Sequence, residues 1–318
     1  MKQYGKSLSG FVLIIVLLLP VMVWGLSLEG QVKEYRLKNG MKVLVLERFF
    51  APVVSLYIRF KVGAVDEAEG ETGTAHLLEH MLFKGTETLG TKNYGEEKKI
   101  LTAIDDLAGQ IDGEMQKGDK ADQESIAAWR EQLQALQREH KEWVIKDEVS
   151  ALYSQNGAEG LNASTGYDIT TYKVSLPSNR IELWASIESD RMATPVFREF
   201  YSERDVVAEE PRRRTETQPW GKLYEELTGT AYLAHPYGYP TIGWMSDIQS
   251  VTVEMAEEFF ETYYGPNNAV CAIVGDIDIE ETKALIRRYF GPIPRREEPP
   301  PVLTEEPEQK GERKTDVV

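Results

Sequence analysis

The chain has 318 residues, of which 42% are hydrophobic and 28% charged, and its formal net charge is −16. This length allows one large domain or two ordinary ones, and the composition is that of a globular protein rather than a disordered one. The negative charge argues against sequence-independent binding of nucleic acid and against wide contact with anionic lipid, because both need clustered Lys and Arg. We therefore expect no nucleic-acid partner.

Residues 1–25 differ in kind from the rest of the chain. Lys2 and Lys6 precede an apolar run from Phe11 to Leu19, which is shorter than the roughly 20 residues that a membrane-spanning helix needs. The segment has the features of a secretory signal, with a cleavage site after Gly25. The alternative is an uncleaved membrane anchor. In both cases we expect an exported protein, periplasmic or secreted, that touches a membrane only through this segment.

The next part of the chain has the alternation of short β-strands followed by a helix. We expect strands over residues 35–37, 42–46 and 53–60. Asn39-Gly40, between the first two, is a dipeptide typical of hairpin turns. A helix is expected over residues 75–84, with Thr72 or Thr74 as its N-cap.

Residues 96–154 are expected to form an inserted helical hairpin. Apolar residues recur at spacings of three and four in two stripes, separated by a polar break at 117–120. The stripes comprise Ile100, Ile104, Leu107, Ile111 and Met115, then Ile126, Trp129, Leu133, Leu136, His140 and Trp143. The other faces are densely charged, which indicates a projecting arm or a lid. We expect no ligand role for His140, at the edge of its stripe.

The remaining elements mix strands and amphipathic helices without strict alternation, which indicates an α+β fold. We expect strands over residues 170–174 and 269–274, and helices over residues 179–192, 201–210, 253–264 and 279–290. Pro211 should end or kink the second of these helices. The expected domain covers residues 30–292, and the Pro- and Glu-rich residues 293–318 are expected to be a linker.

The strongest functional signal is the run His76-Leu77-Leu78-Glu79-His80. Positions i and i+4 of a helix share a face, so both imidazoles can meet one metal ion. Glu79 lies on a nearby edge, where its carboxylate can reach a water at the metal and serve as general base. This order is the reverse of the H-E-x-x-H zinc motif. The alternative is a capped amphipathic helix with two incidental histidines.

A catalytic zinc ion needs three protein ligands, and the expected helix over residues 203–210 is the best source of the third. Glu203 and Glu210 are two helical turns apart and share a face that two valines make partly buried. A buried carboxylate needs a metal, a cation or hydrogen-bond donors. The residues alone do not distinguish Glu203, Glu209 and Glu210. The alternative is a solvated acidic face that pairs with Arg212–Arg214.

The run from Gly73 to Thr86 resembles the pitrilysin family of zinc metallopeptidases, which includes insulin-degrading enzyme and the mitochondrial processing peptidase. Further blocks resemble the same family in the same order: Asn162–Thr165 with Asp168–Tyr172, Glu188–Arg191 before Pro195, and Glu203–Val207. The resemblance covers about residues 33–290. It implies a metallopeptidase half-domain with a mixed, mainly antiparallel sheet and helices packed on one face.

The resemblance also implies roles for individual residues. His76, His80 and Glu210 would bind Zn2+, and Glu79 would be the general base. Glu203 would orient a ligand or the water.

Asn162 and Ala163 match a family edge strand that holds peptide substrate by backbone pairing. A turn residue after Gly160 is the alternative for Asn162. His235, in a segment that also resembles the family, is expected to be structural or to face substrate rather than to bind metal.

Family enzymes enclose their substrate between two related halves, and this chain corresponds to the zinc-bearing half. The expected function is a zinc-dependent metalloendopeptidase that hydrolyses extended peptides or unfolded polypeptides, with a second-half subunit as partner. The alternative is a non-catalytic subunit or fragment that pairs with a second family half to form the substrate chamber. A weaker alternative is an adaptor built around the helical arm.

Overall fold

The computed structural model describes residues 30–215 and 219–316. The chain divides into two units, residues 1–33 and 34–318. The expected signal segment at 1–25 lies outside the described residues. Within the described part of the chain, no helix is both long enough and apolar enough to cross a bilayer.

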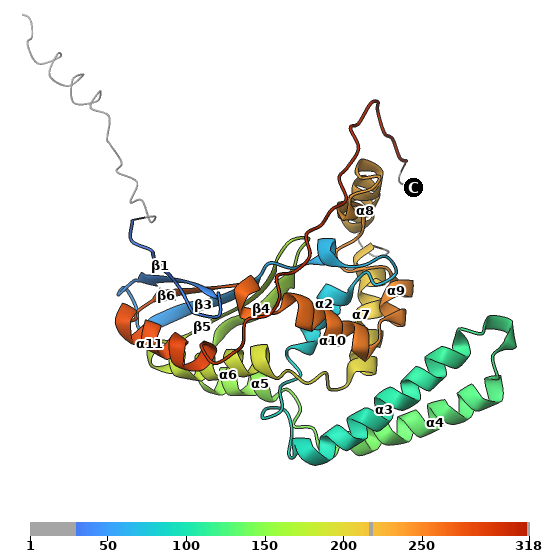
Figure 1. Ribbon diagram of the computed structural model, residues 1–318, viewed down its shortest axis with the longest axis horizontal. Coiled ribbons are helices and arrows are strands. Elements are labelled where there is room, and N and C mark those ends of the chain that lie inside the picture. The colour runs from blue at the N-terminus through green and yellow to red at the C-terminus, as the bar shows by residue number, and fades with distance from the viewer. Residues whose placement is uncertain (1–29, 216–218, 317–318) are drawn as a thin grey trace, which may run out of the picture. The chain divides into compact units, whose positions relative to one another are not determined.

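A six-stranded sheet in the order β1-β2-β6-β3-β5-β4 is the centre of the fold (Figure 1). The strands are β1 (Lys33–Arg36), β2 (Lys42–Glu47), β3 (Val53–Phe60), β4 (Glu159–Thr165), β5 (Thr170–Pro177) and β6 (Ala269–Gly275). β2 runs parallel to β6, whereas β3 pairs antiparallel with β5 and β6, and β4 antiparallel with β5. The expected mixed, mainly antiparallel sheet is confirmed, with β4 at one edge.

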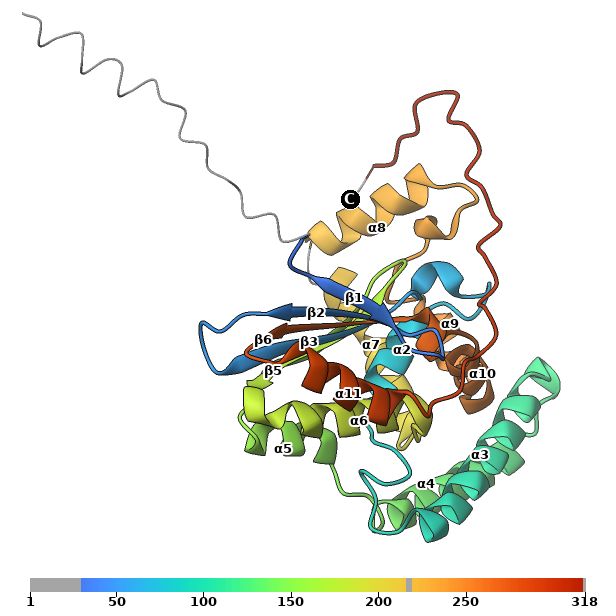
Figure 2. The ribbon, with the colours of Figure 1, turned by 60° about the vertical axis from the view of Figure 1, so that its left-hand side comes forward.

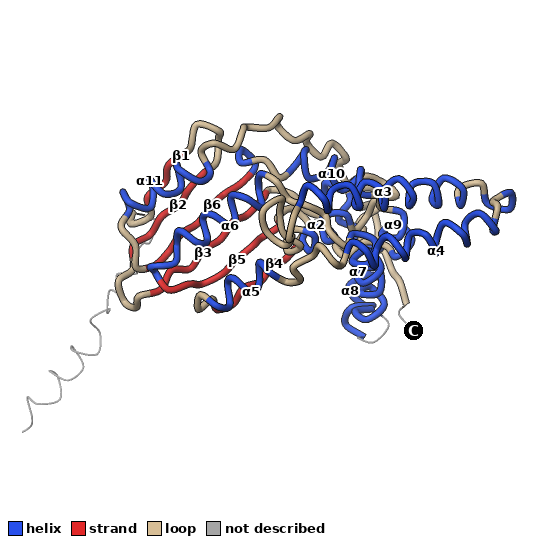
Figure 3. Tube along the Cα trace, turned by 90° about the horizontal axis from the view of Figure 1, so that it is seen from below, coloured by secondary structure: helices blue, strands red, loops and turns tan. Residues whose placement is uncertain are grey.

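Three helices lie side by side over one face of this sheet: α5 (Glu148–Gln155), α6 (Ile181–Ala193) and α11 (Ile279–Phe290) (Figures 2 and 3). Alternate side chains of β3, such as Leu56 and Ile58, are therefore buried. The rings of Trp184 and Phe290 join the covering helices at a centroid distance of 5.8 Å. Cys271 of β6 is fully buried, as expected for an apolar strand.

The other helices are α2 (Thr74–Met81), α3 (Tyr94–Met115), α4 (Gln123–His140), α7 (Phe200–Thr215), α8 (Pro219–Ala231), α9 (Met245–Ser250) and α10 (Val253–Tyr263). Short 3-10 turns are η1 (Ala64–Asp66), η2 (Gly118–Lys120), η3 (Ser178–Arg180), η4 (Pro236–Gly238) and η5 (Pro266–Asn268). Helix α2 packs against α7, α10 and strand β4. This contact brings residues 74–81 and 200–215 together beside the edge of the sheet.

Helices α3 and α4 form the expected antiparallel hairpin, which we call the arm (Figure 1). The expectation that the hairpin extends to residue 154 is wrong, because α4 ends at His140 and residues 148–155 form the separate helix α5. Asp147, with a φ of 55°, has a left-handed backbone that begins α5 in a new direction. Val149 and Tyr153 of α5 are buried in the main core, so this helix belongs to the sheet layer.

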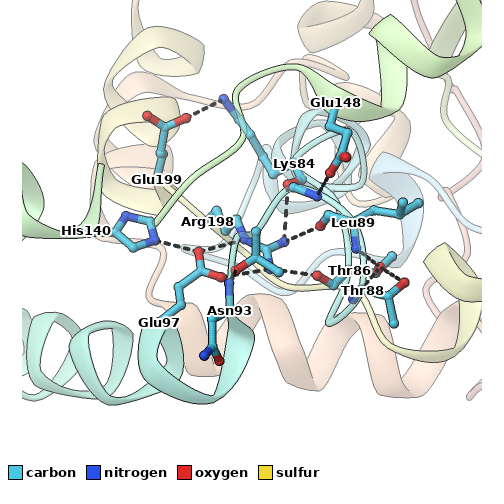
Figure 4. A network of polar contacts seen from close by, with 12 residues as sticks. Lys84, Thr86, Thr88, Leu89, Asn93, Glu97, His140, Glu148, Arg198 and Glu199 are labelled. Atoms are coloured by element: carbon cyan, nitrogen blue, oxygen red, sulfur yellow. Dashed lines mark hydrogen bonds and ion pairs between the residues drawn. The ribbon is translucent and has the colours of Figure 1, made fainter. Parts of the chain in front are cut away.

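The base of the arm is joined to the domain by a buried polar network (Figure 4). Oε1 of Glu97, which is 0% exposed, lies 2.9 Å from Nε2 of His140 and 2.7 Å from Nε of Arg198. Burial acts to raise the pKa of Glu97, but hydrogen bonds from His140 and Arg198 outweigh it and lower the pKa to about 2. Arg198 also donates to the backbone carbonyls of Lys84, Thr86 and Leu89. His140 is thus a structural residue, in agreement with the sequence expectation.

Three features of the C-terminal part differ from expectation or were not foreseen. Pro211 was expected to end or kink its helix. Helix α7 does not end there but runs through Pro211 to Thr215, and packing of α7 against α2, α8 and α9 holds the helix together. Helices α8 and α9 were not expected. Residues 293–316 form neither helix nor strand, and the carboxylate of Glu306 accepts hydrogen bonds from the backbone of residues 233–235.

Candidate metal centre

Helix α2 begins with an unusual cap. Its N-cap residue is Gly73, with a φ of 95°, so the expectation of Thr72 or Thr74 is wrong. The Glu67 carboxylate accepts hydrogen bonds from the backbone N–H of Gly73 (2.9 Å) and of Ala75 (2.8 Å). It therefore accepts from two of the backbone N–H groups that have no hydrogen-bond partner within the helix at its N-terminus. Thr72 donates instead to Asp247.

Gly73 fits this place for a steric reason as well. A Cβ at this position would come within 3.0 Å of Ile248 and of the carbonyl oxygen of Ile242. The left-handed backbone and this close approach both require glycine. The start of α2, and hence the direction of the histidines that follow, is fixed by packing against the loop and helix at 242–248.

His76, His80 and Glu210 converge at the contact between α2 and α7. Nε2 of His76 lies 3.9 Å from Oε2 of Glu210, and Nε2 of His80 lies 3.7 Å from Oε1 of Glu210. One donor atom from each residue lies within 4.8 Å of the other two. Among the described residues, these three form the group of His, Cys, Asp or Glu side chains that could hold a metal ion.

The donor geometry fits zinc. Zn–N and Zn–O bonds of about 2.0–2.2 Å in a tetrahedral site place neighbouring donors roughly 3.4 Å apart, a few tenths of an ångström less than the two distances to Glu210. Two imidazoles and one carboxylate are a donor set of zinc hydrolases that leaves one position for water. His76 is buried, whereas His80 and Glu210 are partly exposed, so the group is accessible from one side.

Glu203 lies behind His80 rather than with the three converging donors. Its Oε1 accepts a hydrogen bond from Nδ1 of His80 at 2.9 Å, which leaves Nε2 facing Glu210. Nζ of Lys84 lies 2.6 Å from the other carboxylate oxygen. The hydrogen bond from His80, together with Lys84, lowers the pKa of Glu203 to about 2. Burial acts to lower the pKa of His80, but Glu203, Glu210 and Glu79 outweigh it and raise that pKa.

Glu79 is half-buried on the same helix, next to His80 in the chain, and acts to raise the pKa of His80. Its Oε2 accepts a hydrogen bond from the Thr165 hydroxyl at 2.6 Å. Thr165 is the last residue of β4, the edge strand. The carboxylate is therefore held from a second element, 86 residues further along the chain.

Asn162 and Ala163 lie within β4, paired with Lys173 and Tyr172 of β5. The alternative of a turn at Asn162 is therefore wrong. Among the described residues β4 ends the strand order, and it packs against α2, the helix that carries His76 and His80. Nδ1 of His235 accepts a hydrogen bond from the backbone N–H of Tyr237 and caps η4, outside the group of converging donors.

The geometry separates the three acids that the residues alone left open: Glu210 faces both histidines, Glu203 supports His80, and Glu209 is exposed. The side chains of Arg212–Arg214, the proposed partners in the alternative, lie outside the described residues. Sequence reasoning missed Glu67, Lys84 and Thr165. Each acts through a contact that no spacing in the chain reveals.

The sheet, the covering helices and the His-His-Glu group together define a half-domain of the zinc peptidase class. Residues 42–118 match the family model described as insulinase (peptidase family M16), and residues 250–318 match the one described as peptidase M16 inactive domain. Over these two segments the chain is similar to the M16, or pitrilysin, family of zinc metallopeptidases.

Individual relatives agree with this assignment. The zinc protease PqqE of Helicobacter pylori is 28% identical over 320 residues, which cover 98% of this chain and 59% of that protein. A crystal structure of a protease from Helicobacter pylori superposes with a TM-score of 0.68 at 28% identity, covering 89% of this chain and 55% of that one. The first half of the periplasmic protease PqqL from Escherichia coli has the same fold, with a TM-score of 0.62 at 22% identity. The match covers 85% of this chain and 48% of that one. The chain thus spans about half the length of these relatives.

Proposed function

We propose that this chain is the zinc-bearing half of a metalloendopeptidase that hydrolyses extended peptides or unfolded polypeptides. His76, His80 and Glu210 would hold Zn2+, and Glu79 would be the general base. The observation that carries the proposal is the convergence of the three donor atoms within 4.8 Å of one another, with Glu79 next to His80 on helix α2. The family names of the relatives support the same chemistry.

When bound, zinc supplies Lewis acidity, which lowers the pKa of a water ligand to about 7 and polarises the scissile carbonyl. Glu79 accepts the proton of the attacking water on a carboxylate oxygen and delivers it to the nitrogen of the leaving amine. Glu203 holds the proton of His80 at Nδ1, so that Nε2 would be available as a ligand of the metal. Lys84 keeps Glu203 ionised for this purpose.

The edge strand β4 supports a substrate in extended conformation. A peptide that adds to a sheet edge forms main-chain hydrogen bonds, which only exposed, unfolded backbone can offer. Asn162 and Ala163 lie in the part of β4 that pairs regularly with β5. A peptide paired at this position would run past α2 and its carboxylate.

The proposed organisation is an export signal at 1–25, the peptidase domain at 30–292 with the helical arm as its insertion, and the linker at 293–318. A second-half subunit would complete the substrate chamber, since the chain spans 59% of the PqqE relative. The PqqL relative is named a periplasmic protease. Export to the periplasm is the corresponding proposal for this chain.

The decisive experiment compares wild-type protein with Glu79→Gln, each loaded with zinc and supplied with a second-half subunit. The substrate is an unfolded polypeptide, and a chelator serves as the negative control. We expect the variant to keep its zinc and lose cleavage, because the amide cannot accept the proton. Retained turnover in a clean preparation of this variant would refute the assignment of the base.

A non-catalytic subunit is the second candidate. Residues 250–318 match a family model named for an inactive domain, which favours this reading. Such a subunit would bind a second family half and help to enclose substrate without cleaving it. The same assay distinguishes the two, because cleavage that depends on a partner's metal site would survive Glu79→Gln in this chain.

A further inference from the structure

We infer that Thr165 is a positioning residue for Glu79, and that through it the substrate-binding edge strand holds the general base in place. This inference rests on the proposed function and deepens it. The Thr165 hydroxyl donates to Oε2 of Glu79 at 2.6 Å. A hydroxyl that donates to a carboxylate makes a charge-assisted hydrogen bond, which is shorter and stronger than a neutral one.

The donor stands on a rigid support. Thr165 is the last residue of β4 and pairs with Thr170, the first residue of β5. Thr170 is fully buried and donates its own hydroxyl to the carbonyl oxygen of Val62. A β-branched side chain has few χ1 conformations. The Thr165 hydroxyl is therefore fixed from the sheet, independently of the helix that carries Glu79.

The contact fixes one oxygen of the Glu79 carboxylate, Oε2, with respect to the sheet. A glutamate has three side-chain torsions, and loss of the contact would let the carboxylate leave the reactive orientation. The rate of proton transfer falls steeply when the donor and acceptor atoms move out of hydrogen-bond range.

The position of Thr165 links base and substrate. It lies three residues after Asn162 on the strand that the peptide is proposed to extend. A peptide paired to β4 would stiffen the strand that ends at Thr165 and so steady the hydroxyl at the moment of reaction. The contact should then affect turnover much more than substrate binding, because the backbone edge that binds peptide does not depend on the hydroxyl.

The first test uses the zinc-loaded chain with its second-half subunit. Thr165→Val replaces the hydroxyl by a methyl group of similar size, and Thr165→Ser restores the hydroxyl without the methyl. We expect Thr165→Val to lower kcat roughly tenfold, a part of the 10²–10⁴ that a general base contributes. KM and zinc content should stay unchanged, and Thr165→Ser should recover most of kcat. Thr171→Val is the matched control, since this half-buried threonine of β5 pairs with Ser164, the residue before Thr165.

The second test needs no turnover. Thermal unfolding of the metal-free chain is compared for Thr165→Val, Glu79→Ala and the double variant. If the hydrogen bond is present, Thr165→Val lowers Tm by roughly 3 °C in the wild-type background. In the Glu79→Ala background it lowers Tm by much less, because the partner is already gone. If the Tm changes of the two single variants simply add in the double variant, the hydrogen bond between Thr165 and Glu79 is absent and the inference is overturned.

The outcomes separate this inference from the proposed function. Wild-type protein without zinc-dependent cleavage overturns the proposed function and with it the role of Thr165. Wild-type cleavage that Thr165→Val leaves intact overturns the inference alone. A fall in kcat that Thr165→Ser does not rescue also overturns it, because a purely structural defect would explain the loss.

Discussion

Glu203 and His80 lie 123 residues apart in the sequence, yet the Glu203 carboxylate accepts a hydrogen bond from Nδ1 of His80 at 2.9 Å. This contact orients the imidazole, so that its other nitrogen lies 3.7 Å from Glu210. Lys84, four residues after His80, holds the far oxygen of Glu203. His80, Glu203 and Lys84 thus form a chain of polar contacts behind the candidate ligand atom. The role of Glu203 can therefore be tested by substitution, as can the roles of the ligands.

Replacing Glu203 should weaken zinc binding without removing a ligand. We expect Glu203→Ala to lower zinc affinity by about 10- to 100-fold, because outer partners of a ligating histidine contribute this much. Competition with a chromogenic chelator measures the change. Glu199→Ala is the control. Oε2 of Glu199 lies 3.6 Å from Nζ of Lys84, whereas the hydrogen bond from His80 goes to Glu203. Equal affinity of Glu203→Ala and wild type would contradict the role given to Glu203.

Zinc should stabilise the folded chain. A ligand that binds only the native state adds about 2.7 kcal/mol to the unfolding free energy when its free concentration is 100 times Kd. We expect a rise in Tm on adding zinc, reversed by a chelator and absent in His80→Ala. If His80→Ala gains as much Tm from zinc as wild type does, His80 is not a ligand.

The cap of α2 should contribute measurably to stability. Glu67→Ala removes the acceptor of two backbone N–H groups, those of Gly73 and Ala75. We expect a loss of roughly 1–2 kcal/mol, the cost of removing a side-chain N-cap. Glu67→Gln keeps an acceptor oxygen and should lose less. Chemical denaturation gives the values, with the exposed Glu69→Ala as control; equal losses for the two alanine variants would show that Glu67 does not cap the helix.

The buried network at the base of the arm should make stability depend on pH. The pKa of Glu97 is lowered from 4.5 to about 2 in the folded protein. Its stabilisation is thus fully present above about pH 4.5 and is lost as the pH falls through 2. Glu97→Gln leaves the buried Arg198 guanidinium without a carboxylate partner. We expect the free energy of unfolding to fall by about 3–5 kcal/mol at pH 7.

Melting temperatures at pH 7, 5 and 3 check this prediction. The difference in Tm between wild type and Glu97→Gln should be large at pH 7 and 5 and smaller at pH 3. Glu96→Gln, at an exposed neighbouring position that pairs with Lys99, is the control and should show little gap at any pH. A gap for Glu97→Gln that stays constant across the range would contradict the assigned pKa.

Elements with a strong local signal were predicted well. The expected helix over residues 279–290 matches α11, where Asp278 caps the first turn and Phe290 closes the buried stripe. The arm was predicted from its two stripes of apolar residues. The residue at which it ends was not predicted, because α5 continues the helical pattern in the sequence but packs in the main core of the domain. Helix α8 was missed; its Trp220, Tyr224 and Leu227 are exposed, so no buried stripe marked it.

The sequence by itself determined the pair His76 and His80, since helical periodicity alone puts residues four apart on one face. Glu79 followed from the same motif. The residues alone left Glu203, Glu209 and Glu210 open, and only the resemblance pointed to Glu210. The tertiary structure places Glu210 opposite the two rings, because the rotation of α7 against α2 is set by side-chain packing between the helices. The same holds for Glu67, Lys84 and Thr165, whose roles depend on which distant elements the folded core brings into hydrogen-bond range.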